Sequence, residues 1–322
     1  MKYRFEYLPY RRKFRRPLAT AHGVWEHREG IIIRLEREDG AYGFGEVAPV
    51  PWFGTETMEA ALKGCEFFSG LGIVDPRDLP TNNMPCFNWA VSSAIDGQQQ
   101  PLAREFTVAA LETNLGELDE KRHSGFRTFK RKIGVAEVEA EMKAVDSFVA
   151  ELEEGQRLRL DANSGLSEHD FKRWLEFLEG KPVEFLEQPL APGLENRMLE
   201  IVEPFSTPLA LDESIAGLDS LLRWRDWPGV LVVKPSLLGW IGDENLPPIV
   251  GSSVFETAFG FEAALQFLSR HQKTDTAIGF GTNDLFESDG WSLHGNGAFL
   301  TSGEITNSDL QNLWEEKREN IS

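Results

Sequence analysis

Three acidic residues recur at nearly even intervals in this chain, and each one ends a short apolar run. They are Asp161 in LRLDAN, Glu187 in VEFLEQP and Asp212 in PLALDES, about 25 residues apart. If the three runs are neighbouring strands, their carboxylates converge and need a cation to balance them. Carboxylate oxygens are the ligands that Mg²⁺ prefers, and Mn²⁺ accepts the same set. The spacing therefore predicts a site for Mg²⁺ or Mn²⁺.

Lysines flank this series on both sides, with Lys130 and Lys132 upstream in FKRKIG and Lys234 downstream in VLVVKPS. Side chains two apart on a strand point to the same face, so Lys130 and Lys132 would lie side by side. If both are buried, desolvation and mutual repulsion lower their pKa values, which makes a lysine a base near neutral pH. A solvent-facing strand would give the same K-x-K pattern. Lys234, which ends an apolar run, favours the buried alternative.

Each charged residue also has an ordinary structural explanation. A single acidic residue at a strand end often caps the following helix, although three in successive units argue against this reading. The six histidines form no H-x-x-x-H pair, so zinc is not indicated. Asn163 and Glu213 stand next to the carboxylates and are expected to orient them, or to act as cap or turn residues. Ser252 and Ser253 are candidate hydrogen-bond donors to a substrate, or turn residues.

Strands at this spacing indicate β/α units, because a crossover between parallel strands needs a dozen or more residues. The pattern predicts an α/β fold with a (β/α)₈ barrel over residues 101–289, where the charged residues lie at the C-terminal strand ends that carry active sites. The helix after Lys234 is the least defined, since Pro247 and Pro248 leave little room for it. The predicted strands are 106–110, 127–132, 157–161, 183–187, 208–212, 229–234, 251–255 and 276–279.

Residues 1–100 have a different pattern, with strand-like segments followed by helical ones. This order predicts an α+β capping domain, against which residues 290–322 pack back. The polar stretch Ala19–Glu29 is expected to be a loop that folds over the barrel mouth, or an ordinary surface loop. The expected strands are Lys2–Tyr7, Gly30–Arg37 and Ala41–Val47, and the expected helices are Glu56–Ser69 and Phe87–Ile95.

Composition excludes several classes of protein. The chain has 322 residues, 41% of them hydrophobic and 26% charged, which is typical of a globular protein. A net charge of −19 argues against nucleic acid or an anionic membrane as partner. Cys65 and Cys86 form no C-x-x-C pair, and no stretch resembles a signal peptide or membrane span, so we expect a cytoplasmic protein with reduced thiols. The sequence leaves the oligomeric state open.

The order K-x-K, D-x-N, E-Q-P, D-E-S and K-P resembles the enolase superfamily, in its muconate-lactonizing branch, over essentially the whole chain. Within the branch, REG at Arg28–Gly30 and GFGEVAPVPWFGTET at Gly43–Thr57 resemble the capping domain of o-succinylbenzoate synthases. Dipeptide epimerases of the branch carry a D-x-D after the last strand. Here AIGFGTNDLF has Asn283 and Asp284 side by side and no D-x-D, which argues against an epimerase.

The resemblance implies the removal of a proton α to a carboxylate, followed by loss of a hydroxyl group. The product would be o-succinylbenzoate, an intermediate of menaquinone or phylloquinone synthesis. Mg²⁺ held by the three carboxylates would bind the small-molecule carboxylate substrate and stabilise the enediolate. Lys132 would be the base and return its proton to the departing hydroxyl, Lys130 would keep the pKa of Lys132 low, and Lys234 would face the intermediate as a cation.

Two alternatives remain open at this point. A cycloisomerase or an N-acyl-amino-acid racemase of the same superfamily would use the same metal ligands, with Lys132 and Lys234 exchanging the α-proton on opposite faces. A non-catalytic barrel with a structural Mg²⁺ site would also retain the carboxylates, but it has no need for buried lysines.

Overall fold

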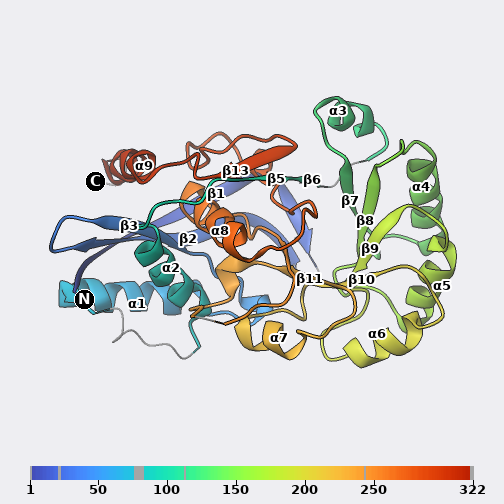
Figure 1. The fold of residues 1–322 in the computed structure, drawn as a ribbon, viewed down its shortest axis with the longest axis horizontal. Coiled ribbons are helices and arrows are strands. Elements are labelled where there is room, and N and C mark those ends of the chain that lie inside the picture. Colours follow the sequence, from blue (N-terminus) through green and yellow to red (C-terminus); the bar gives the residue numbers. More distant parts are fainter. Residues whose placement is uncertain (1, 21–22, 76–82, 112–113, 243, 320–322) are drawn as a thin grey trace.

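The computed structural model describes residues 2–20, 23–75, 83–111, 114–242 and 244–319. An antiparallel capping sheet lies on one side of the molecule, and a curled parallel sheet with helices on its outer surface lies on the other (Figure 1). The predicted combination of an α/β barrel with an N-terminal α+β cap is confirmed. Among the described residues, no helix is both long and apolar enough to cross a membrane.

The capping sheet has the order β3-β2-β1-β4, and its core contains the free thiols Cys65 and Cys86. Burial raises the pKa of both thiols, so neither is a reactive thiolate. The strands of the capping sheet and the helices that accompany them are, in chain order, β1 (Tyr3–Thr20), β2 (Gly23–Arg37), β3 (Tyr42–Val47), the 3₁₀ turn η1 (Pro51–Phe53), α1 (Met58–Leu71), β4 (Ile73–Val74) and α2 (Pro85–Asp96).

The expectation of a loop at Ala19–Glu29 is wrong for most of that stretch. Strands β1 and β2 form a long antiparallel hairpin, and their pairing continues to Thr20 opposite Gly23. Residues 21–22 lie outside the described residues. A two-stranded ribbon is held by its backbone hydrogen bonds, so it tolerates the polar side chains that suggested a loop.

The parallel sheet has the order β12-β11-β10-β9-β8-β7-β6, and its strands lie within a few residues of the predicted ones. They are β6 (Ala109–Ala110), β7 (Thr128–Lys132), β8 (Arg157–Asp161), β9 (Val183–Glu187), β10 (Leu209–Leu211), β11 (Val230–Val233) and β12 (Val250–Gly251). The helices are α3 (Leu118–His123), α4 (Val138–Ala150), α5 (Glu168–Leu178), α6 (Glu195–Val202), α7 (Leu218–Arg223) and α8 (Ala258–His271). After Lys234, the described residues before β12 form only the 3₁₀ turn η3 (Pro235–Leu237).

The barrel is closed by single bridges rather than by the predicted strand at 276–279. Ile278 bridges Val108, and Gly279 bridges Ser252, so this segment lies between β6 and β12. A Cβ atom at Gly279 would lie 3.0 Å from the hydroxyl oxygen of Ser252, which is tighter than ordinary packing. A glycine here permits this close approach, but it weakens a strand because it loses more backbone entropy on folding and has no side chain to pack.

Alternation along the strands sends the charged residues into the barrel interior. Phe185, Ala210 and Val232 form a small buried cluster on β9, β10 and β11. Glu187, Asp212 and Lys234 each lie two residues further along, and therefore on the same inward face. The residues between them belong to the large core beneath the helices: Leu186, Leu211 and Val233.

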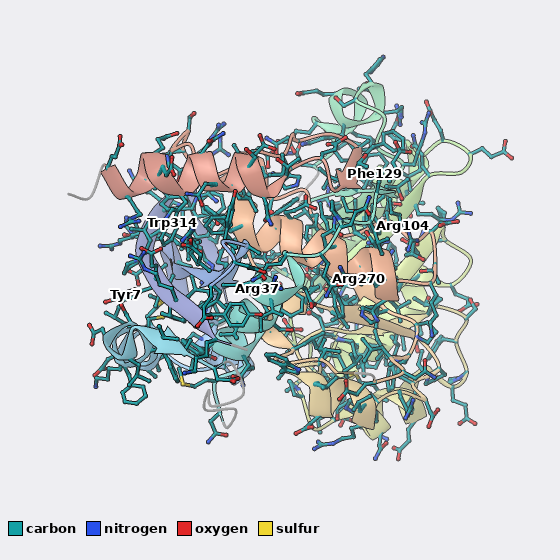
Figure 2. All side chains as sticks on the ribbon, turned by 60° about the vertical axis from the view of Figure 1, so that its left-hand side comes forward. Tyr7, Arg37, Arg104, Phe129, Arg270 and Trp314 are labelled. Carbon is teal, nitrogen blue, oxygen red and sulfur yellow. The ribbon has the colours of Figure 1, made fainter. Side chains whose placement is uncertain are left out.

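The C-terminal segment returns to the capping sheet. After the 3₁₀ turn η4 (Asn283–Leu285), strand β13 (Phe299–Ser302) pairs antiparallel with β5 (Arg104–Thr107). Helix α9 (Asn307–Glu319) follows and packs on the sheet, and Figure 2 places Trp314 between them. Trp314, Leu310 and Leu313 share a buried cluster with Leu8, Ile32 and Phe44.

Candidate active site

Strand register brings the predicted charged residues to one edge of the sheet. Lys132 on β7 is level with Asp161 on β8, and Asp161 is level with Glu187 on β9. Asp212 directly follows β10, and Lys234 directly follows β11. The five residues therefore lie at the C-terminal ends of consecutive parallel strands, where barrel enzymes place their catalytic groups.

The lysines and carboxylates contact one another directly. Lys130 Nζ lies 2.7 Å from Asp161 Oδ2 and 2.8 Å from Glu187 Oε1. Lys234 Nζ contacts Asp212 Oδ1, and all three carboxylates are buried. Buried charges of one sign need partners of the other, and here the ammonium groups of Lys130 and Lys234 lie against these carboxylates.

Burial and the neighbouring charges shift the pKa values of groups in this cluster. Burial, together with the charges of Asp161 and Asp212, raises the pKa of Glu187 to about 7. For Lys130, burial alone would lower the pKa, but the adjacent carboxylates outweigh burial and raise it above its usual value. The expectation of a lowered pKa is therefore wrong for Lys130, because its nearest charges are carboxylates rather than another lysine.

The donor chemistry of this cluster suits a divalent cation. It offers carboxylate oxygens from Asp161, Glu187 and Asp212, which are the hard ligands that Mg²⁺ and Mn²⁺ prefer. Within the part of the chain that the structure describes, no three Asp, Glu, His or Cys side chains lie close enough to hold an ion as they stand. The ammonium groups of Lys130 and Lys234 lie against the oxygens instead.

Asn163 and Glu213 both lie beside the carboxylates, as expected. The backbone N–H of Asn163 donates to Asp161 Oδ1 at 3.0 Å, and its side-chain amide donates to Glu213 Oε1 at 3.1 Å. Burial and the adjacent Asp212 raise the pKa of Glu213 to about 8. Asn163 adopts a φ of 42°, a left-handed conformation that asparagine tolerates better than most residues.

Gln188 is a residue that we did not predict, although it directly follows Glu187 in the sequence. Its Oε1 accepts hydrogen bonds from the backbone N–H groups of Asp212 and Ser214, at 2.9 and 3.1 Å. Its Nε2 donates to the carbonyl of Leu190 and the hydroxyl of Ser214. Fully buried, this side chain fixes the end of β10 relative to β9. The available signal was a polar amide at the end of an apolar strand.

The two serines occupy different environments. Ser252 is half-buried and bridges Gly279, whereas Ser253 is buried. Ser253 donates its hydroxyl proton to Glu256 at 2.5 Å, and its oxygen accepts a hydrogen bond from the N–H of Phe255. The donor that we expected Ser253 to offer a substrate is therefore used within the protein.

Aromatic side chains of the capping domain contact Lys234 and the turn after β12. The ring of Phe53 in η1 lies 4.5 Å from Lys234 Nζ, within range of a cation–π interaction. Trp25 of β2 packs edge-on against Trp52 and against Phe255, which follows β12. The capping hairpin thus contacts the C-terminal face of the barrel at the position expected for Ala19–Glu29.

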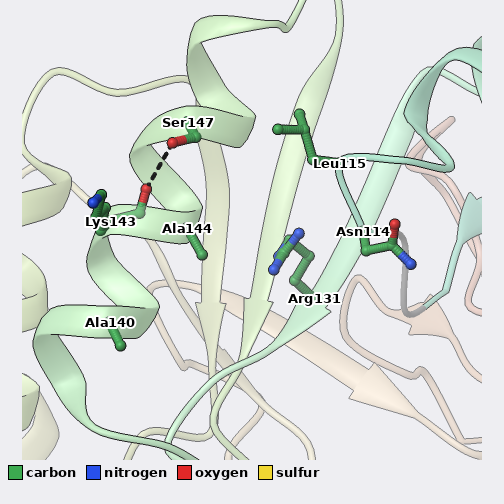
Figure 3. Close-up of a pocket in the computed structure, with 7 residues that line it drawn as sticks. All are labelled: Asn114, Leu115, Arg131, Ala140, Lys143, Ala144 and Ser147. Carbon is green, nitrogen blue, oxygen red and sulfur yellow. Dashed lines mark hydrogen bonds between the residues drawn. The ribbon is translucent and has the colours of Figure 1, made fainter.

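A groove on the outside of β7 is separate from this site (Figure 3). Its volume is about 340 Å³, and Arg131 reaches it between β7 and α4. Because side chains alternate along a strand, Arg131 points away from the face that carries Lys130 and Lys132. The other lining residues are Asn114, Leu115, Ala140, Lys143, Ala144 and Ser147.

Comparison with known proteins agrees with this arrangement. The model of enolase C-terminal domain-like proteins matches residues 115–242. An o-succinylbenzoate synthase of Thermosynechococcus vestitus is 33% identical over 87% of this chain and 92% of its own length. The crystal structure of an o-succinylbenzoate synthase from Thermosynechococcus elongatus, with magnesium in its active site, superposes with a TM-score of 0.81 at 30% identity, covering 97% and 99% of the two chains.

More distant structures share the fold. The L-Ala-D/L-Glu epimerase of Bacillus subtilis superposes with a TM-score of 0.79 over 93% of this chain and 95% of its own, at 19% identity. The strand-end lysines and carboxylates, the barrel with its capping sheet and the full-length likeness to a relative agree with one another. This chain belongs to the enolase superfamily, in its mandelate racemase and muconate-lactonizing branch.

Proposed function

We propose that the chain is an o-succinylbenzoate synthase, which dehydrates a 2-succinyl-6-hydroxycyclohexadiene carboxylate to o-succinylbenzoate in menaquinone or phylloquinone synthesis. The observation that carries this proposal is the likeness to a synthase over nearly the full length of both chains. The strand-end cluster supports it, because proton removal next to a carboxylate needs both a base and positive charge.

Asp161, Glu187 and Asp212 would hold Mg²⁺ or Mn²⁺, since they form an oxygen-only set at adjacent strand ends. When bound, the ion supplies positive charge to the substrate carboxylate as the α-proton leaves. Asn163 and Glu213 hold the ends of these strands in place through their hydrogen bonds.

The lysines divide the proton chemistry. Lys132, in its neutral form, takes the proton α to the carboxylate and returns it to the departing hydroxyl on the same face, so that water is the leaving molecule. Lys130 keeps its positive charge between Asp161 and Glu187. Lys234 presents a second positive charge from β11, on the other side of the carboxylates. Catalysis then depends on the placement of charge where the substrate becomes more negative.

The direct test is conversion of the cyclohexadiene carboxylate precursor with Mg²⁺, and with EDTA as control. We expect turnover that stops with EDTA and returns when excess Mg²⁺ is added. A folded protein that binds Mg²⁺ but does not convert the precursor would overturn the proposal.

Racemisation of N-acyl amino acids is a second candidate, favoured by the lysines on both sides of the carboxylates. Such a reaction requires proton exchange on both faces of the substrate, by Lys132 and Lys234. Incubation of each enantiomer in D₂O distinguishes the activities, because a dehydratase without racemase activity leaves the α-position of acyl amino acids unlabelled.

Replacement of Lys132 with alanine tests the assignment of the base. We expect Lys132→Ala to fold and to bind Mg²⁺ with unchanged affinity, while kcat falls by about 10²- to 10⁴-fold, because the α-proton has lost its acceptor. Calorimetry with Mg²⁺ and single-turnover kinetics measure the two properties separately. Substantial remaining activity would assign the base to another residue.

We also propose a capping domain at residues 1–100 and 290–322 around a catalytic barrel at 101–289. The packing of α9 against the capping sheet supports this division. The buried free thiols support a location in the reducing cytoplasm. The net charge of −19 supports a small carboxylate substrate bound through a cation, rather than a nucleic acid or a membrane as partner.

A further inference from the structure

Glu256 is a buried carboxylate in the turn between β12 and α8, and the reaction above assigns it no role. Only 1% of its surface is exposed. Its Oε1 accepts a hydrogen bond from the hydroxyl of Ser236 at 2.6 Å. Its Oε2 accepts from the hydroxyl of Ser253 at 2.5 Å and from the N–H of Val254 at 2.9 Å. One side chain therefore joins the segments that follow two different barrel strands.

The first of these segments carries Lys234. Ser236 lies two residues after Lys234 in η3, and it is fully buried. The carbonyl of Lys234 accepts the N–H of Leu237, which closes the same short turn. The bond from Ser236 to Glu256 thus fixes the direction in which the chain leaves β11, and with it the origin of the Lys234 side chain.

The second segment is the turn at residues 252–255, which directly follows β12 at the C-terminal end of that strand. Phe255 has a φ of 67°, an unfavourable conformation for a bulky residue. Two contacts hold it there: its N–H donates to Ser253, and its ring packs against Phe14 and Trp25 of the capping hairpin. Glu256 binds the hydroxyl of that same Ser253.

The capping sheet secures Glu256 from the other side. The carbonyl of Glu256 accepts a hydrogen bond from Arg12, a buried residue of β1. The next residue, Thr257, donates its N–H to Glu46 of β3 at 3.0 Å. The position of Glu256 is therefore determined jointly by the barrel and by the capping sheet.

We propose that Glu256 is a positioning residue for Lys234, holding its strand end against the turn at 252–255 and linking both to the capping sheet. This inference rests on the proposed function, in which Lys234 faces the developing negative charge. Displacement of that ammonium group removes an interaction that is strongest in the transition state, so it lowers kcat more than it raises KM.

Two variants test the link with different severity. Glu256→Met removes all three hydrogen bonds at similar volume, whereas Ser236→Ala removes the single bond to η3 and leaves the turn at 252–255 intact. We expect kcat to fall by about ten- to a hundred-fold in Glu256→Met and by a smaller factor in Ser236→Ala, as for small misplacements of a charged group. Glu256→Gln should recover part of the rate, since its amide oxygen can face Ser253 and Val254 while the Ser236 hydroxyl turns to accept.

A matched control is Glu262→Met, the same substitution at another buried glutamate. Glu262 bonds His294, Gln266 and Gly303, and none of these described residues is a partner of Glu256 or of η3. This variant should lose stability but retain kcat. If kcat falls equally in Glu256→Met and Glu262→Met at equal loss of stability, Glu256 is merely structural and the proposal is overturned.

A double-mutant cycle with Lys234→Ala shows whether the effect passes through Lys234. In that background, we expect Ser236→Ala to cause no further loss of kcat, whereas an independent role would give additive losses. If the wild type does not convert the precursor, the proposed function fails, and the side-chain Nζ resonance of Lys234 tests the positioning role by itself. That resonance, assigned by its loss in Lys234→Arg, should shift in Ser236→Ala and stay in place in Glu262→Met. An unchanged resonance in Ser236→Ala would overturn the inference.

Discussion

Gln188 shows how a neutral side chain determines the arrangement of charged ones. It is fully buried, and its oxygen accepts the N–H groups of Asp212 and Ser214 while its nitrogen donates to two further oxygens. Its φ of 36° is a conformation that few residues adopt without support. The carboxylates of Glu187 and Asp212 therefore depend on the amide between them for their relative position.

Replacement of Gln188 with methionine should weaken Mg²⁺ binding and destabilise the fold together. Two buried N–H groups would lose their acceptors, at about 1–3 kcal/mol each, and the end of β10 would be free to move relative to β9. Calorimetry with Mg²⁺ and urea unfolding measure the two effects. Gln156→Met is the matched control. Gln156 is also buried, but it bonds Glu153 just before β8, at the opposite end of that strand from Asp161. Unchanged Mg²⁺ affinity in Gln188→Met would contradict this role.

Helix α8 begins at a carboxylate supplied by another element. Glu46 of β3 accepts the N–H groups of Thr257 and Gly260 and the hydroxyl of Tyr10, so two N–H groups that a helix start leaves unpaired are satisfied by the capping sheet. Burial raises the pKa of Glu46 above its usual 4.5, in spite of these hydrogen bonds. The carboxylate of Glu46 orders the junction between β3 and α8, although burial disfavours its charged form.

The raised pKa of Glu46 predicts that the free energy of unfolding depends on pH. Above pH 4.5 the unfolded chain releases the proton of Glu46 before the folded protein does, so the folded state binds more protons. The free energy of unfolding contributed by this group therefore falls as pH rises from 4.5 through the raised pKa. We expect the stability advantage of the wild type over Glu46→Gln to be larger at about pH 5.5 than at about pH 8, measured by urea unfolding. An advantage that grows with pH would contradict a raised pKa.

Sequence patterns predict the elements that have local causes. The strands β8 and β9 follow directly from apolar runs that end in Asp161 and Glu187. The hairpin at Ala19–Glu29 was not predicted, because it is held by backbone pairing and its polar side chains show no strand pattern in the sequence. Glu46 was also missed, since Thr257 and Gly260, which donate to it, are 211 and 214 residues away and come close only in the folded chain. Glu256 was missed because nothing in the sequence shows that the turn after β12 meets Ser236 of η3.

At the scale of the whole molecule, the two ends of the chain meet on one sheet. Strands β1 to β3 have one side against α1 and α2, while α9 covers the other (Figure 1). Trp314 is nearly inaccessible to solvent and packs on Phe44 of β3. The C-terminal helix is thus part of the hydrophobic core that orders the capping sheet.

Trp314→Ala should destabilise the protein by about 3–5 kcal/mol, the usual cost of removing a large buried aromatic side chain. Trp240→Ala serves as control, since Trp240 is 44% exposed and its loss should cost much less. Thermal and urea unfolding measure both variants. Equal stability of the two variants would show that α9 contributes little to the capping sheet.

The backbone pairing of the strands is uneven around the barrel wall, and this determines which part of the wall opens more readily. Strands β7 and β8 pair over five consecutive positions, whereas β12 has two residues and the segment 276–279 pairs through single bridges, Ile278 with Val108 and Gly279 with Ser252. Long ladders resist local opening, and isolated bridges do not. The proposed metal ligands Asp161 and Glu187 thus stand on the part of the wall with the longer ladders, whereas the segment 276–279 is joined to its neighbours by isolated bridges. Local opening of the barrel therefore costs less free energy at the segment 276–279 than at the strands that carry Asp161 and Glu187.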